Sequence, residues 1–136
     1  MRRVRRLSSE EIVAYDLVPP EIARRAVLIR VPVLPPRADG LTSGRFVLLR
    51  TDEPTDGTSR LIAHELIHVR QFRELGRIGF ALRYFSAYFR NLARFRRHRR
   101  AYFEIPQEQE AYGRSRAWDV ARLRRAAAAA AAAPTV

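Results

Sequence analysis

Short blocks of apolar residues near the N-terminus predict two strands separated by a loop. Residues 26–34 (AVLIRVPVL) and 45–50 (RFVLLR) are rich in β-branched and other apolar residues, as strands usually are. Pro32 removes a backbone donor from the first strand, so we expect this strand at a sheet edge or at a bulge. Ahead of the strands, Ser8 and Glu11 have the spacing of a capping box and predict a short helix.

Helical periodicity dominates the rest of the chain. Residues 60–75 form one helical pattern that ends at Gly76, residues 78–97 form a second, and a third begins at Pro106 and continues to about residue 125. In the second pattern, apolar residues recur at spacings of three and four, whereas arginines share a different face. The apolar positions are Ile78, Leu82, Phe85, Phe89 and Leu92, and the arginines are Arg83, Arg90, Arg94 and Arg97.

These elements indicate one α+β domain. We expect a small N-terminal β-sheet packed against two or three helices, with the helix over residues 60–75 at the centre. The domain should occupy residues 8–125, between a basic mobile arm at residues 1–7 and an alanine-rich tail at residues 126–136. A chain of 136 residues, of which 47% are apolar, can bury one core of this size.

The strong positive charge has two possible origins. The net charge is +12, and all 26 basic residues are arginine. The arginine-rich helix at residues 78–97 would suit nucleic acid or an anionic membrane surface, because aromatic side chains lie between its arginines. Alternatively, GC-rich codons account for the abundant arginine and alanine, and the helix is an ordinary core helix with a solvated arginine face.

Composition excludes several classes of protein. The chain has no cysteine, so disulfides and thiol nucleophiles are excluded, and any metal site must use His, Asp or Glu. Arginines interrupt every apolar run before the roughly 18 residues that a membrane span needs. The basic N-terminus lacks the apolar segment of a secretory signal. We therefore expect a cytoplasmic protein without a transmembrane segment, either free or peripheral to a membrane.

Residues 61–72 (LIAHELIHVRQF) contain the pattern His-Glu-x-x-His. On a helix, His64 and His68 lie one turn apart and about 40° apart around the axis, so both imidazoles can reach one ion. Glu65 lies about 100° from His64 and can reach a water bound to that ion. Two histidines with an adjacent carboxylate are the arrangement in which zinc activates water at neutral pH. The alternative is a buried helix whose histidines stand one turn apart by coincidence.

A third ligand must come from another part of the chain, and Glu108 is the best candidate. In a helix that begins at Pro106, Glu108 lies on the face that we expect to point inward. That face is defined by Ala111, Ser115 and Trp118. A lone inward carboxylate requires a cation, which is either the metal ion or one of the many arginines.

Other candidate ligands fit less well. Glu104 precedes the third helix and Glu110 should face solvent, but both remain alternatives to Glu108. Glu74 would point away from His68 on an unbroken helix. His98 lies among four arginines that would repel a divalent cation.

The histidine motif at residues 64–68, followed after a helix by Glu-x-Glu-Ala at residues 108–111, resembles the gluzincin family of zinc metallopeptidases. Residues 64–72 (HELIHVRQF) also resemble small bacterial proteins of the HExxHVxQ type, which are mostly uncharacterised metallopeptidase-like domains. The resemblance covers about residues 45–112, half the chain. It implies that the strand at residues 45–50 borders a groove in which an extended peptide could add as a further strand. It also implies that the zinc ligands are His64, His68 and Glu108 and that Glu65 is the general base.

We therefore interpret the protein as a zinc-dependent metallopeptidase that uses one Zn²⁺ ion on a peptide or protein substrate. Glu65 would take a proton from the activated water and pass it to the leaving amine. Tyr112, one turn after Glu108, could donate to the oxyanion, as could Tyr102; the alternative is that both are packed aromatics. A different function is that of a catalytically inactive metallopeptidase-like protein that binds nucleic acid or an anionic membrane through residues 78–97.

Overall fold

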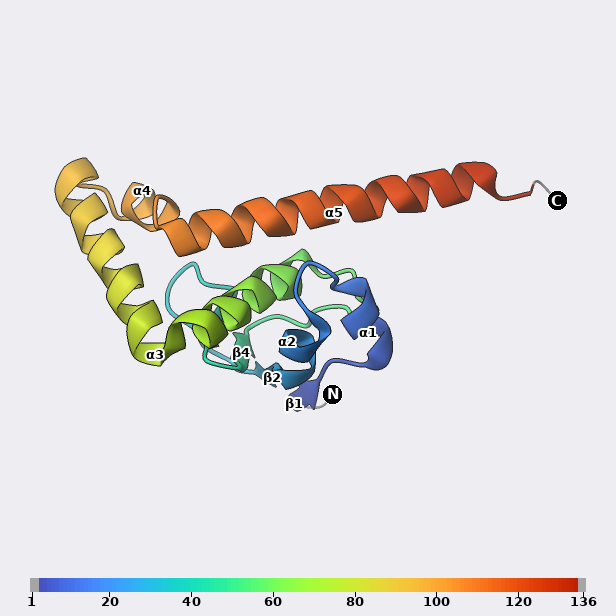
Figure 1. Ribbon diagram of the computed structural model, residues 1–136, viewed down its shortest axis with the longest axis horizontal. Coiled ribbons are helices and arrows are strands. Elements are labelled where there is room, and N and C mark those ends of the chain that lie inside the picture. Colours follow the sequence, from blue (N-terminus) through green and yellow to red (C-terminus); the bar gives the residue numbers. More distant parts are fainter. Residues whose placement is uncertain (1–2, 135–136) are drawn as a thin grey trace.

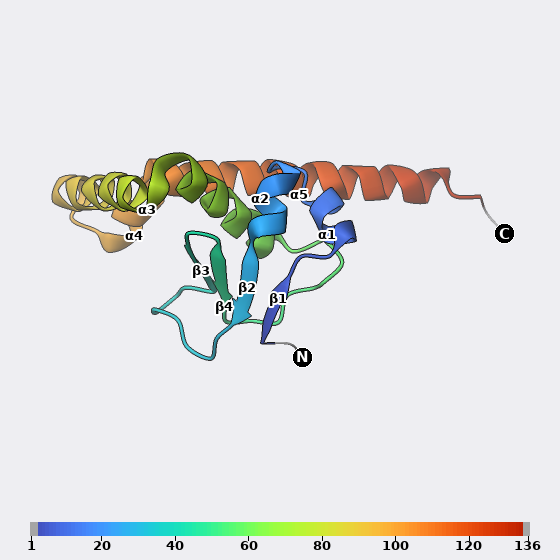
Figure 2. The ribbon, with the colours of Figure 1, turned by 60° about the horizontal axis from the view of Figure 1, so that its bottom comes forward.

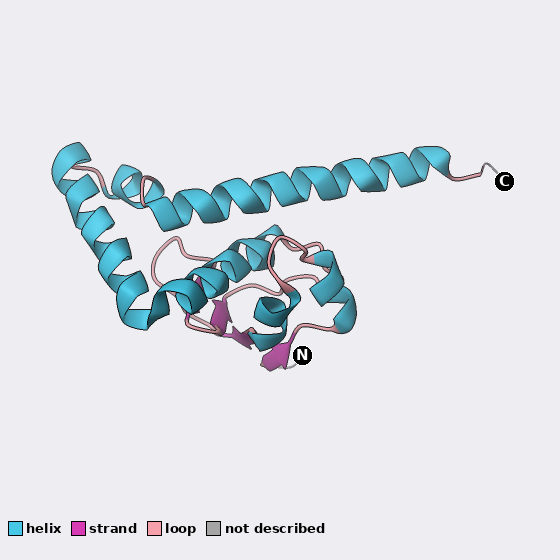
Figure 3. Ribbon diagram, in the orientation of Figure 1, coloured by secondary structure: helices cyan, strands magenta, loops and turns pink. Residues whose placement is uncertain are grey.

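The computed structural model describes residues 3–134 and has the α+β architecture expected from the sequence. A four-stranded mixed sheet lies on one side of the helices (Figure 2), and helices make up most of the chain (Figure 3). In chain order the elements are β1 (Val4–Arg6), α1 (Ser9–Ala14), α2 (Pro20–Arg25), β2 (Val27–Arg30), β3 (Gly40–Ser43), β4 (Phe46–Leu49), α3 (Arg60–Phe95), α4 (His98–Phe103) and α5 (Pro106–Ala132).

The sheet has the strand order β1-β2-β4-β3. β2 and β4, the two strands expected from the sequence, pair in parallel, with Val27 opposite Phe46 and Arg30 opposite Leu49. β1 and β3 add antiparallel on the two outer sides. The expectation that the first predicted strand lies at an edge was wrong, because β2 lies between β1 and β4. Pro32 does not prevent this, since β2 ends at Arg30.

Residues 4–6 of the expected mobile arm form the edge strand β1. Arg5 makes a bidentate ion pair with the buried carboxylate of Glu11, at 2.7 and 3.1 Å. Leu7, the residue that follows β1, is buried. This part of the arm is therefore part of the domain, whereas residues 1–2 lie outside the described residues. Ser8 and Glu11 form the predicted capping box at the start of α1.

The helical patterns at residues 60–75 and 78–97 form two helices, as the sequence predicts, and the two meet at a sharp kink within α3 (Figure 1). The bend is at Gly76, whose φ of 73° and ψ of 166° lie in a region that essentially only glycine adopts. The first half of α3 packs against the sheet, and the second half leads to α4 and then to α5, which runs back past the first half (Figure 1).

The hydrophobic core lies between the sheet, α1, α2, the first half of α3 and the middle of α5. Trp118 of α5 packs its ring 5.3 Å from that of Tyr15 and donates its indole N–H to the carbonyl of Ala14 at 2.9 Å. The third predicted helix thus reaches the N-terminal elements. It continues through Ala132 into the expected alanine-rich tail, of which residues 135–136 lie outside the described part.

The second half of α3 differs from an ordinary core helix. Its apolar positions Ile78, Leu82, Phe85 and Phe89 are 77%, 64%, 55% and 61% exposed. The alternative of a core helix with a solvated arginine face is therefore wrong for this segment, because both its apolar and its arginine positions meet solvent. Among residues 3–134, no helix has the length and apolar character needed to cross a membrane.

Candidate metal centre

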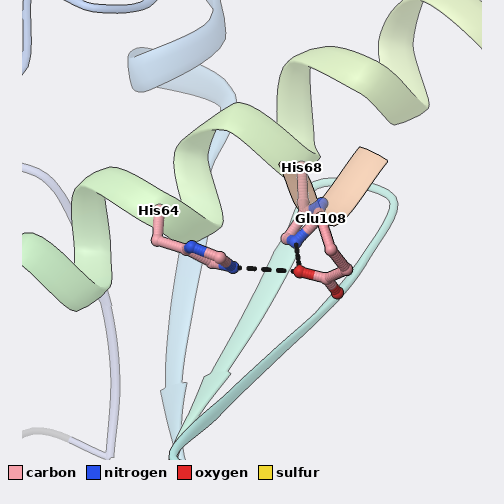
Figure 4. Close-up of side chains that lie close together, drawn as sticks. All are labelled: His64, His68 and Glu108. Carbon is pink, nitrogen blue, oxygen red and sulfur yellow. Dashed lines mark hydrogen bonds and ion pairs between the residues drawn. The ribbon is translucent and has the colours of Figure 1, made fainter. Parts of the chain in front are cut away.

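The first half of α3 positions the two histidines of the motif. Ser59 caps this helix by accepting the N–H of Ile62 at 3.1 Å. The side chains that pack into the core are fully buried, namely Ile62, Ala63, Leu66 and Ile67. His64 and His68 project from the same side of the helix, one turn apart, and are themselves buried (Figure 4).

Glu108 reaches these histidines from the first turn of α5, which begins at Pro106. Its Oε1 lies 3.2 Å from His64 Nε2 and 3.0 Å from His68 Nε2 (Figure 4). Each of the three residues offers one ligand atom, all within 4.8 Å of one another, and all three are buried. The structure thus brings together the three residues that the sequence singled out as ligands.

The spacing of these atoms suits a metal ion. Tetrahedral zinc with bonds of about 2.0–2.1 Å holds neighbouring ligand atoms ~3.3 Å apart. The observed separations of 3.0 and 3.2 Å are close to that edge length. The group could therefore hold a metal ion after small movements. Two imidazoles and one carboxylate suit zinc, but they also suit iron, copper and nickel, so the ligand set alone does not identify the metal.

Charge and burial oppose each other at this centre. Burial acts to raise the pKa of Glu108, but hydrogen bonds from His64 and His68 outweigh burial and hold that pKa well below its ordinary value. Burial acts to lower the pKa of His68, and the contact with the Glu108 carboxylate reverses this effect and raises it. The carboxylate is therefore ionised and favours a cation beside it, whether an imidazolium or a metal ion.

Gln71, which the sequence did not indicate as functional, fixes the orientation of His68. The amide Nε2 of Gln71 donates to the carbonyl of Gln107 at 3.1 Å and to Oε1 of Glu110 at 2.8 Å. Its Oε1 must then be the atom that faces His68 Nδ1, at 2.8 Å, and accepts the N–H there. The other ring nitrogen, Nε2, is left to face Glu108, where a metal ion would replace its proton.

Tyr84 is a second residue that the sequence did not indicate. It lies in the second half of α3, beyond the bend at Gly76, and donates its hydroxyl to Oε2 of Glu108 at 2.7 Å. Burial and then the Glu108 charge raise the pKa of Tyr84, so it stays a donor. Because Tyr84 binds Oε2, Oε1 of Glu108 remains directed at the two histidines.

The side chain of Glu65 extends from α3 to the edge strand β3 and is not part of the three-residue group. Thr42 of β3 donates its hydroxyl to Glu65 Oε2 at 2.6 Å. Gly40 makes this approach possible, because a Cβ at that position would come within 2.9 Å of Glu65 Oε1. The expected general base is therefore a buried carboxylate that β3 covers.

Tyr112 lies beside the candidate centre, and Tyr102 contacts Tyr112. The Tyr112 ring packs edge-on against His64 with centroids 4.4 Å apart, and this residue is 37% exposed. Tyr112 is thus a neighbour of the buried group and is itself partly exposed to solvent. Burial raises the pKa of both tyrosines, so both hydroxyls are protonated at neutral pH.

The remaining candidates lie elsewhere. Glu110 pairs with Arg70 and Arg114 instead of the histidines. Burial acts to raise the pKa of Glu110, but hydrogen bonds from Gln71 and Arg70 hold that pKa below its ordinary value. Three further candidates, Glu104, Glu74 and His98, are exposed and lie outside the group. The Nδ1 atom of His98 lies 2.5 Å from the Tyr88 hydroxyl.

The expectation that residues 45–50 border a peptide-binding groove was wrong. β4 is an interior strand, because β2 and β3 already bond to its two sides. The strand next to Glu65 that has an open side is β3, which lies in the segment predicted to be a loop.

Comparison with known families gives one match, over the segment that carries the histidine motif. Residues 35–76 match the eCIS core domain. This is a domain family of extracellular contractile injection systems, and its description names no peptidase. The match covers just under a third of the chain and includes β3, β4 and the first half of α3, but not Glu108. The comparisons with curated proteins and with solved structures found no match, so the expected likeness to gluzincins gains no support from relatives.

Proposed function

We propose that the protein is a zinc-dependent metallopeptidase whose metal ligands are His64, His68 and Glu108. The observation that carries the proposal is the convergence of three buried ligand atoms, with Glu108 Oε1 at 3.2 and 3.0 Å from the two imidazole Nε2 atoms. Two of these ligands belong to a His-Glu-x-x-His helix, in which the carboxylate between the histidines is suited to proton transfer.

The residues around the group have distinct roles in this proposal. A bound zinc ion would supply activated water and would polarise the scissile carbonyl. Thr42 binds one oxygen of Glu65, and the other oxygen would take the proton of the water and pass it to the leaving amine. Tyr112, protonated and partly exposed beside His64, would donate to the oxyanion.

The substrate of this reaction would be an extended peptide. β3 is an edge strand, and its Thr42 contacts the general base. A peptide that pairs with the open side of β3 would run close to Glu65 through main-chain hydrogen bonds. The match to the eCIS core domain suggests a setting as well, and we propose that the protein acts together with a contractile injection system.

The deciding experiment is metal content by elemental mass spectrometry on the purified protein. We expect about one zinc per chain in the wild type, as a single site of this kind holds one ion. His64→Ala and Glu108→Ala should lose it, whereas His98→Ala, which removes an exposed histidine, should keep it. A folded wild-type protein that takes up no added zinc would overturn the metal site.

Hydrolysis is tested separately from metal binding. Glu65→Gln keeps the shape of the side chain and all three ligands, so it should bind zinc as the wild type does. It should lose cleavage of a peptide library by at least about 100-fold, because a general base contributes 10²–10⁴-fold. An active Glu65→Gln protein would contradict the mechanism without affecting the metal site.

A further inference from the structure

The second half of α3 carries a line of exposed apolar side chains, which we call the apolar stripe. It consists of Ile78, Leu82, Phe85 and Phe89. At 100° per residue these four positions fall within about 60° of one another around the helix axis, so they form one continuous strip along about three turns. Such a strip is larger than the single exposed apolar residues that any protein surface carries.

The outward orientation of the stripe is fixed by contacts that the other side of the helix makes. The opposite side of this helix is anchored to the protein: Phe80 stacks on Phe72 with ring centroids 3.7 Å apart and is buried. Asn91 donates to the carbonyl of Ala101 in α4 at 3.2 Å, and Tyr84 binds Glu108. The rotation of the helix is therefore fixed, and it directs the stripe outward.

Positive charge surrounds the stripe. Residues 77–103 contain eight arginines and no aspartate or glutamate. Around the axis, Arg77 and Arg90 lie nearest the stripe, each about 80° from its closest edge on opposite sides, and Arg83 and Arg94 lie about 100–120° from it. All four are exposed. The side chains of Arg77 and Arg90 are long enough to extend toward the plane of the stripe from its two sides.

We propose that the apolar stripe and its flanking arginines dock the protein on an anionic membrane surface. An interfacial helix has this arrangement, with aromatic and aliphatic residues at the boundary between headgroups and acyl chains and with basic side chains on the lipid phosphates. The helix would lie in the plane of the membrane. This surface is independent of the metal site, and the proposal stands or fails without the peptidase activity.

Charge decides between a membrane and other occupants. A second copy of the chain placed on the stripe would bring two sets of exposed arginines together, with no acidic residue between positions 77 and 103 to compensate them. Nucleic acid would neutralise the arginines and could stack bases on Phe85 and Phe89, but it would leave the aliphatic half of the stripe, Ile78 and Leu82, without an apolar partner. Anionic lipid satisfies both the apolar stripe and the arginines.

The test is co-sedimentation of the full chain with phosphatidylcholine vesicles, with and without phosphatidylserine. We expect binding to the anionic vesicles and little to the neutral ones. Phe85→Ser/Phe89→Ser should weaken binding by at least about tenfold, because two aromatic side chains no longer enter the membrane. The matched control is Val13→Ser/Val33→Ser, which removes two apolar side chains that are each 78% exposed outside the stripe. This control should bind as the wild type does.

A second pair of variants separates the local surface from the net charge. Arg90→Glu/Arg94→Glu and Arg24→Glu/Arg116→Glu change the net charge equally, and all four positions are exposed. Only the first pair should reduce binding strongly. Insertion is read directly from Phe85→Trp, whose fluorescence should shift to the blue on anionic vesicles, since the native Trp118 is already buried.

Three outcomes would overturn the proposal. One is the absence of binding to anionic vesicles. Another is equal loss in both charge variants with no effect of Phe85→Ser/Phe89→Ser, which would show attraction by net charge alone. The third is a wild-type protein that dimerises in sedimentation analysis and does so only with an intact stripe, which would make the stripe a contact between two copies.

Discussion

At the scale of single residues, the most informative side chain beside the candidate ligands is Gln71. Its amide nitrogen is bound by the Gln107 carbonyl and by Glu110, so its oxygen faces His68 Nδ1. Gln71→Ala removes the acceptor that keeps Nε2 available for metal. We expect zinc affinity to fall about 10–100-fold, as measured by competition with a chromophoric chelator, because partners that orient a ligand histidine contribute this much.

The control for Gln71 is Gln109→Ala, which removes an exposed glutamine from the same turn of α5 as Glu108. This variant should keep wild-type zinc affinity. Equal zinc affinity in folded Gln71→Ala would show that Gln71 serves stability alone.

Tyr84 acts on the centre from the other side. Its hydroxyl donates to Glu108 Oε2 at 2.7 Å, which orients Oε1 toward the histidines. Tyr84→Phe removes that hydrogen bond and preserves the ring, so we expect zinc affinity to fall by about tenfold, the lower end for a group that orients a ligand. Tyr88→Phe, which removes a hydroxyl bound to His98 away from the centre, is the matched control and should leave the affinity unchanged.

The sequence indicated which three residues lie together better than it indicated the residues that support them, for a physical reason. Helical phase from Pro106 is enough to direct Glu108 inward, and the i, i+4 spacing is enough to align His64 with His68. The roles of Gln71 and Tyr84 depend on contacts between α3 and α5 and on the bend within α3. No spacing along the chain encodes those contacts.

At the scale of elements, the bend at Gly76 determines where the second half of α3 lies. A side chain at φ 73° and ψ 166° is strained even though no atom lies within 4 Å of its Cβ position. Gly76→Ala should therefore lower the free energy of unfolding by about 1–3 kcal/mol in urea titrations. Gly79→Ala, three residues on in regular helix with only an ordinary Cβ contact of 3.6 Å, should instead raise it by about 0.4–1 kcal/mol. A neutral Gly76→Ala would mean that the bend is soft.

Elements with strong patterns were predicted, and short polar ones were not. β2, β4 and the long helices have apolar or periodic sequences that indicate their type. β3, with the sequence Gly-Leu-Thr-Ser, has only one apolar side chain and forms because β4 offers it a partner across a tight turn at Gly44. β1 is similarly polar and is held by the ion pair of Arg5 with Glu11. Both strands depend on neighbours that the sequence pattern does not name.

At the scale of the whole molecule, the candidate centre joins two segments that are far apart in the chain. His64 and His68 belong to α3 and Glu108 belongs to α5. Along the chain, the second half of α3 and the whole of α4 separate the two segments. A metal ion that binds all three would therefore close a large part of the chain on itself. Because the unfolded chain cannot present the three ligands together, metal binding should stabilise the folded state.

We expect free zinc at about 100 times its dissociation constant to raise the free energy of unfolding by about 2.7 kcal/mol. Denaturant titration with and without zinc measures this, and a chelator should reverse it. Glu108→Ala should abolish the gain, since the remaining histidines both lie on α3 and no longer link it to α5. His98→Ala should show the full gain, because that residue lies outside the group. If Glu108→Ala retained the whole gain, zinc would be binding to the α3 histidines alone, and Glu108 would serve only as their buried counter-ion.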